Sequence, residues 1–66
     1  MMDKSKTVNG IQVEAREWQK GSAHRIYFSA GKQGQACWDV VNYQWISVHG
    51  EFGARFKAAI KVAWNL

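Results

Sequence analysis

Apolar and polar residues alternate with a period of two along much of this chain. Ile11, Val13 and Ala15 alternate with polar residues, which is typical of a strand with one buried face. This pattern predicts a strand from about residue 10 to 18.

Three more short segments are rich in β-branched and aromatic residues and are bounded by turn-forming residues. These predicted strands lie at 24–29, 36–41 and 45–48. Asn9-Gly10 is a strong signal for a two-residue hairpin turn. Thr7-Val8 before it is either a short first strand or chain that leads into the sheet. Residues 1–6 are polar and charged, and we expect them to fray.

The apolar spacing becomes helical from Glu51 onward. The residues on the apolar side of this helix are Phe52, Phe56, Ala59, Ile60 and Ala63. A helix over about 51–65 is too short to be stable alone, so it must pack on the sheet. The expected fold is therefore α+β: one domain over 1–66, with a small antiparallel sheet of three to four strands at about 7–48, packed against one C-terminal helix.

The alternation also predicts which side chains face the helix. Those expected to face it are Ile11, Val13, Ala15, Ile26, Phe28, Ile46 and Val48. Those expected on the opposite, open face are Arg16, Trp18, Arg25, Tyr27, Ser29, Trp45 and Ser47. The third strand is ambiguous: with Trp38 and Val40 inward, Cys37, Asp39 and Val41 point outward. A one-residue bulge would reverse any of these assignments.

The composition suggests a role for the open face. The net charge is +4, and the 66 residues include four Trp, two Tyr and three Phe. A basic balance favours anionic partners. Aromatic rings stack on bases while Arg and Lys neutralise phosphates. We therefore expect a non-enzymatic module that binds DNA or RNA. The predicted nucleic-acid-binding residues are Arg16, Trp18, Lys20, Arg25, Tyr27, Lys32 and Trp45.

Other interpretations of the same residues stay open. A basic β-ribbon can also enter a duplex major groove, and Asp39 would oppose either binding mode if it lay centrally. The aromatic residues also suit a core or a protein interface, so the alternative function is a protein-interaction module or a small homodimer. Arg55, Lys57 and Lys61 on the helix form a rival basic surface.

Motifs for catalysis or metal binding are weak. The spacing of Gly31-Lys32-Gln33-Gly34 matches a backbone-clamping GxxG loop, but here the loop is expected to join strands rather than helices. Cys37, His24 and His49 lack the paired spacings of a zinc site. The carboxylates are scattered singly. We expect no cofactor, no metal and no enzymatic activity.

Cysteine content and hydropathy bear on the compartment. A single cysteine fits a reducing environment. No apolar run reaches the roughly 20 residues of a membrane span. The charged start lacks an apolar stretch, so we expect no signal peptide, a cytoplasmic location and no membrane partner.

Overall fold

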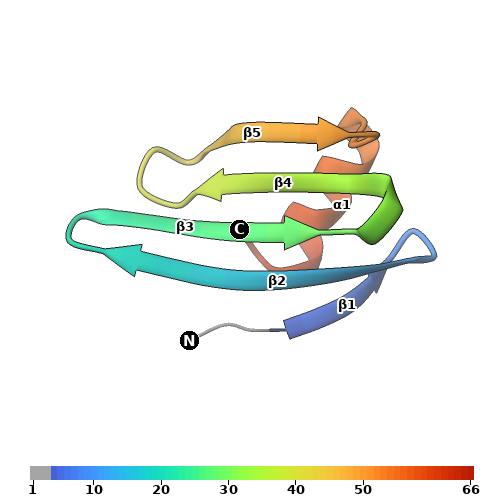
Figure 1. Ribbon diagram of the computed structural model, residues 1–66, viewed down its shortest axis with the longest axis horizontal. Helices are drawn as coiled ribbons and strands as arrows, with labels where there is room; N and C mark the ends of the chain where they lie inside the picture. The colour runs from blue at the N-terminus through green and yellow to red at the C-terminus, as the bar shows by residue number, and fades with distance from the viewer. Residues whose placement is uncertain (1–3) are drawn as a thin grey trace.

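The chain folds into one antiparallel sheet with a helix on one side. The computed structural model describes residues 4–66. Its elements are β1 (Lys4–Val8), β2 (Ile11–Lys20), β3 (Ala23–Ser29), the 3-10 turn η1 (Gly31–Gln33), β4 (Gly34–Asp39), β5 (Gln44–Gly50) and α1 (Ala54–Ala63). The strands pair in chain order, so β1 and β5 are the two edges. Helix α1 crosses one face and leaves the opposite, open face uncovered (Figure 1).

The α+β class is confirmed, but the number of strands is higher than expected. The sheet has five strands rather than three to four, because the chain before Asn9 forms the full strand β1. Asn9 and Gly10 both adopt positive φ, at 51° and 78°, as a tight hairpin turn of this kind requires. Residues 4–6, expected to fray, belong to β1, and residues 1–3 lie outside the described residues.

The core lies between the sheet and α1. Val13 from β2, Phe28 from β3 and Ile60 from α1 are at most 1% exposed. Burying a large apolar side chain stabilises a fold by about 1.5–3 kcal/mol. Beyond α1, the ring of Trp64 meets Phe28 edge-on, with ring centroids 5.1 Å apart. These contacts hold the helix on the sheet, because its own ten residues would not form a stable helix alone.

A β-bulge in β5 changes which residues face the core. Cys37 of β4 pairs with Ser47, but the next residue, Trp38, pairs with Trp45. Ile46 is therefore the extra residue of the bulge. It was expected to face the helix, yet it is 44% exposed and is not among the buried core residues.

The bulge makes the predicted open-face position of Trp45 wrong. Its register places it beside Trp38 on the helix side, where its ring lies 5.1 Å from that of Trp38 and 5.8 Å from that of Phe28. The other face assignments that depend on strict alternation in β2 and β3 are confirmed. Trp38 of the ambiguous third strand faces inward and is 2% exposed.

The helix is shorter than the 51–65 expected from its apolar spacing. Gly53 has extended backbone angles and precedes the first helical residue, Ala54. Glu51 still continues the sheet, since its amide donates to the carbonyl of Gln33. No helix within residues 4–66 is long and apolar enough to cross a membrane.

Candidate nucleic-acid interface

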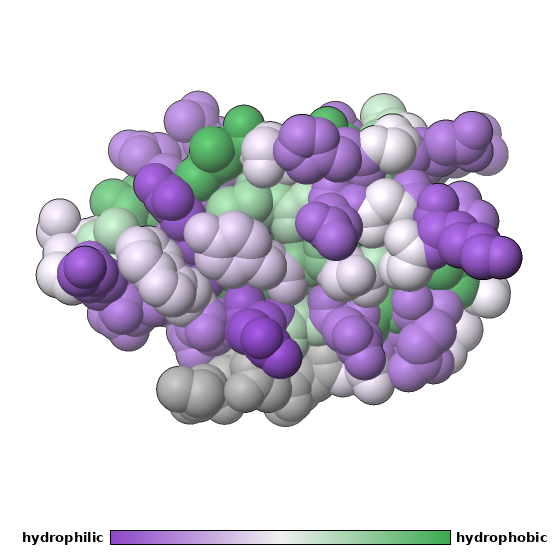
Figure 2. Space-filling model, in the orientation of Figure 1, coloured by the Kyte–Doolittle hydropathy of each residue, from purple (hydrophilic) through white to green (hydrophobic). Residues whose placement is uncertain are grey.

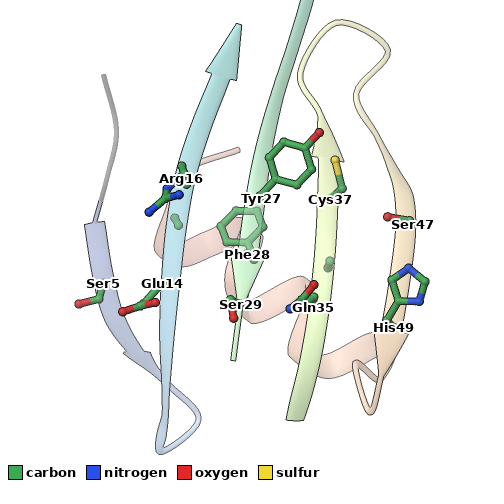
Figure 3. Close-up of a pocket in the computed structure, with 12 residues that line it drawn as sticks. Ser5, Glu14, Arg16, Tyr27, Phe28, Ser29, Gln35, Cys37, Ser47 and His49 are labelled. Atoms are coloured by element: carbon green, nitrogen blue, oxygen red, sulfur yellow. The ribbon is translucent and has the colours of Figure 1, made fainter. Parts of the chain in front are cut away.

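The strand registers arrange the open face in three rows that run across the strands. The first row contains Trp18, Arg25, Asp39 and Gln44; the second contains Arg16, Tyr27, Cys37 and Ser47; the third contains Ser5, Glu14, Ser29, Gln35 and His49. Figure 3 shows the second and third rows projecting from the side of the sheet opposite α1. Side chains from five strands thus form one continuous surface.

Two aromatic residues on this surface are exposed. Trp18 is 39% and Tyr27 43% exposed. They lie on neighbouring strands in a diagonal relationship, since Trp18 pairs with Arg25 and Tyr27 pairs with Arg16. Diagonal neighbours of this kind are about 7–8 Å apart. Each of these aromatic residues is therefore directly opposite an arginine and diagonal to the other aromatic residue.

Five of the predicted binding residues come together here. They are Arg16, Trp18, Lys20, Arg25 and Tyr27, and we call them the open-face cluster. The guanidinium carbon of Arg25 lies 5.6 Å from the centroid of the Trp18 ring, a cation–π contact. Lys20 closes the cluster at the β2–β3 turn.

The other two predicted residues lie elsewhere. Lys32 belongs to η1, next to the β1–β2 turn and at the opposite end of the sheet from Lys20. Trp45 lies on the helix side, as described above. The expected GxxG loop indeed joins two strands, β3 and β4, rather than two helices.

A shallow hollow lies beside the cluster, over the second and third rows. Its volume is about 640 Å³, and its lining includes Arg16, Tyr27, Cys37, Ser47 and His49. In Figure 2 the space-filling surface shows paler and green atoms at the centre of this face, between purple side chains. The hollow forms because the central side chains are small while those around them are long.

Sequence reasoning missed the polar third row that borders this hollow. Gln35 and His49 come from β4 and β5, and they meet Ser29 and Glu14 only through the strand registers. The alternation in β4 is ambiguous, and the bulge shifts the alternation in β5. The sequence of the loop between β3 and β4 does not by itself fix the register in which these two strands pair.

Asp39 belongs to the first row of the open face, and its carboxylate is bonded within the turn that follows β4. Its carboxylate accepts hydrogen bonds from the side-chain amide of Asn42 at 2.7 Å, from the Asn42 backbone at 3.1 Å and from the Val41 backbone at 2.9 Å. These bonds, the Asn42 side chain first, lower the pKa of Asp39. Arg25 is its cross-strand partner. These bonds hold the Asp39 carboxylate at the C-terminal end of β4, against the turn that follows it.

Cys37 lies in the floor of the hollow. It is 5% exposed, and burial raises the pKa of its thiol. Arg25 and the Tyr27 hydroxyl act in the opposite direction but do not offset burial. A protonated thiol is a poor nucleophile, so this cysteine serves as a small side chain of the floor.

Two lysines on the helix side of the sheet, Lys61 of α1 and Lys6 of β1, contact aromatic rings of the fold. The Lys61 ammonium lies 4.9 Å from the Trp38 ring and 5.1 Å from the Tyr43 ring. Lys6 donates to the carbonyl of Ala63 and lies 5.3 Å from the Trp64 ring. Among the basic residues of α1, Arg55 is exposed, whereas the two lysines are half-buried.

His24, one of the candidate metal ligands, instead bonds Glu17 across the β2–β3 hairpin. No group of three or more His, Cys, Asp or Glu side chains in residues 4–66 is arranged to hold a metal ion.

Comparison with protein-family models, curated proteins and solved structures finds no match to this chain.

Proposed function

We propose that this protein binds single-stranded nucleic acid on its open face. The observation that carries the proposal is the pairing of exposed rings with arginines: Trp18 opposite Arg25, and Tyr27 opposite Arg16. A base stacked on an aromatic ring contributes about 1–3 kcal/mol of binding free energy. In this proposal the adjacent guanidinium groups contact the phosphates on either side of a stacked base.

Exposed rings favour a single strand over a duplex. In a duplex the base faces are already stacked on each other, so Trp18 and Tyr27 would have nothing to stack on. The hollow beside Tyr27 offers hydrogen-bonding groups to base edges or sugars, including the Gln35 amide and the Ser47 hydroxyl. The mixed charge of the face favours modest affinity, because Arg16, Lys20 and Arg25 are accompanied there by Glu14 and Asp39.

The proposal is tested by fluorescence anisotropy of labelled single-stranded DNA, single-stranded RNA and duplex DNA at two salt concentrations. We expect saturable binding that prefers a single strand and weakens with salt. Arg16→Gln should lower the affinity and reduce the salt slope by about 0.7 for each phosphate that the arginine no longer neutralises.

The matched control is Arg55→Gln, which removes the same charge from the exposed surface of α1. It should leave the affinity nearly unchanged. Absence of binding to all three ligands at tens of micromolar protein and low salt would overturn the proposal. Equal losses of affinity in both variants would show that net charge, rather than the open face, governs binding.

A further inference from the structure

Strand β5 has a free edge. It pairs with β4 on one side, and within residues 4–66 no other element lies along its outer side (Figure 1). The amide of Glu51 donates to the carbonyl of Gln33, which fixes the alternation of backbone groups along this ladder. Counting back from that pair, Ser47 and His49 direct their backbone groups toward β4. Val48 therefore directs its N–H and C=O outward, to the free edge.

The two edges of the sheet differ in charge. The sequence of β1 contains Lys4 and Lys6 in five residues. The seven residues of β5, Gln-Trp-Ile-Ser-Val-His-Gly, contain no Asp, Glu, Lys, Arg or Pro. Lysine and proline are the usual devices that prevent a sheet edge from pairing with another chain. Strand β5 has only its bulge at Ile46 for this purpose, and that bulge lies to one side of Val48.

Two of the exposed side chains of β5 are apolar, while Gln44 and His49 are polar and exposed. Ile46 is 44% and Val48 37% exposed. In Figure 2 a few green atoms lie among purple and white ones at the upper margin, where β5 runs in the same orientation. A β-branched strand of this kind is well suited to pairing with another strand.

We propose that β5 pairs antiparallel with β5 of a second copy of this chain, about a two-fold axis at Val48. The two outward-facing Val48 residues then exchange backbone N–H···O=C bonds. Ser47 lies opposite His49 of the second copy, a polar pair on the open face. A second copy fits this edge because each chain has a charge of +4, and two such chains repel least where they meet through an uncharged strand.

This arrangement joins two five-stranded sheets into one of ten strands. The two-fold axis is perpendicular to the sheet, so both open faces lie on the same side and both helices on the other. The pairing also compensates for the small core of a 66-residue chain, since association is a common way to stabilise small domains. It does not depend on nucleic-acid binding.

Sedimentation equilibrium of the full chain over a range up to about 1 mM tests the proposal. We expect a monomer–dimer equilibrium, with a dissociation constant raised at least tenfold by Val48→Lys. Thr7→Lys is the matched control, because it adds the same charge to a β-branched position of the other edge strand. It should leave the dissociation constant within about twofold of the unsubstituted chain.

Amide hydrogen exchange of the unsubstituted chain gives a second readout at the interface. The Val48 amide should exchange more slowly as protein concentration rises, whereas amides of β1 should not. If Val48→Lys fails to fold, Ile46→Lys takes its place. A monomer at 1 mM, or a dimer in which Val48 exchange is independent of concentration, would overturn the proposal; a monomer would leave the edge to a different kind of partner.

Discussion

Trp18 and Tyr27 are large rings that the fold leaves in contact with solvent, although the chain has few residues with which to build a core. Removing either ring should therefore affect binding more than stability. We expect Tyr27→Ala to weaken single-strand binding by about 1–3 kcal/mol, and Tyr27→Phe to retain most of the affinity because the ring is kept. Anisotropy titrations of both variants, with thermal melts to verify folding, check this expectation. Equal losses in the two variants would point to the hydroxyl instead of stacking.

The lowered pKa of Asp39 predicts how the free energy of unfolding depends on pH. Hydrogen bonds, first from the Asn42 side chain, lower its pKa in the folded state below the ordinary value of 3.8. The ionised Asp39 carboxylate therefore stabilises the fold fully at pH values above 3.8. This stabilisation is lost as the pH falls through the lower pKa of the folded state. Urea unfolding between pH 2 and 6 should show a steeper acid-side loss of stability for the unsubstituted chain than for Asp39→Asn. Parallel curves would contradict the assigned hydrogen bonds.

At the residue scale, sequence alternation placed most side chains on the correct face. It succeeded in β2 and β3, whose pairing runs from Glu14–Ser29 to Lys20–Ala23 without a bulge. It failed at Trp45, because a single bulged residue reverses every assignment that precedes it on the strand. Nothing in the local sequence marks Ile46 as that residue.

At the element scale, the end of β5 depends on two glycines that lie very close together. A Cβ on Gly50 would lie 2.6 Å from the Gln33 carbonyl oxygen and 2.7 Å from the Gly34 Cα, and Gly50 has a φ of +84°. The conformation alone costs other residues about 1–3 kcal/mol. Gly50→Ala should therefore lower the unfolding free energy by more than that amount.

Gly53→Ala is the matched control, since a Cβ there meets nothing within 4 Å. It should change stability by less than about 1 kcal/mol. Chemical denaturation of both variants measures the difference. Similar stability of the two would show that the close approach of Gly34 and Gly50 is not required.

Helix α1 provides a second comparison within one element. Ile60 is fully buried, whereas Val62 is 81% exposed. We expect Ile60→Val to cost about 0.5–1.5 kcal/mol and Val62→Ala less than about 0.5 kcal/mol. Denaturation midpoints with unchanged slopes report these values directly. A larger cost at Val62 would mean that this residue is covered by a partner in solution.

The elements themselves were largely predictable. The helical spacing indicated α1, although its start moved to Ala54 because Gly53 remains extended. The turn at Asn9-Gly10 indicated a hairpin, but in the strand before it Val8 is buried while Ser5, Lys6 and Thr7 are exposed, and such a polar segment resembles a frayed end. That strand is formed through pairing with β2, which short-range patterns do not reveal.

At the scale of the whole molecule, the structure refines the binding surface expected from the sequence. Charge and aromatic content predicted an anionic partner on the open face and left Arg55, Lys57 and Lys61 of the helix as a rival basic surface. The β2–β3 register brings the open-face cluster together on one face of the sheet. Lys32 lies in η1 and Trp45 packs against the core, so neither belongs to this cluster. The packing of Lys6 and Lys61 onto core rings also reduces the free positive charge on the helix side.

Chemical-shift mapping by two-dimensional NMR with a short single-stranded oligonucleotide tests binding at the open face most directly. We predict that the indole N–H of Trp18 and the amides around Arg16, Arg25 and Tyr27 shift on titration, while the indole of the buried Trp64 stays nearly fixed. Shifts confined to α1 around Arg55 and Lys57, or no shifts at any residue, would contradict binding at this face.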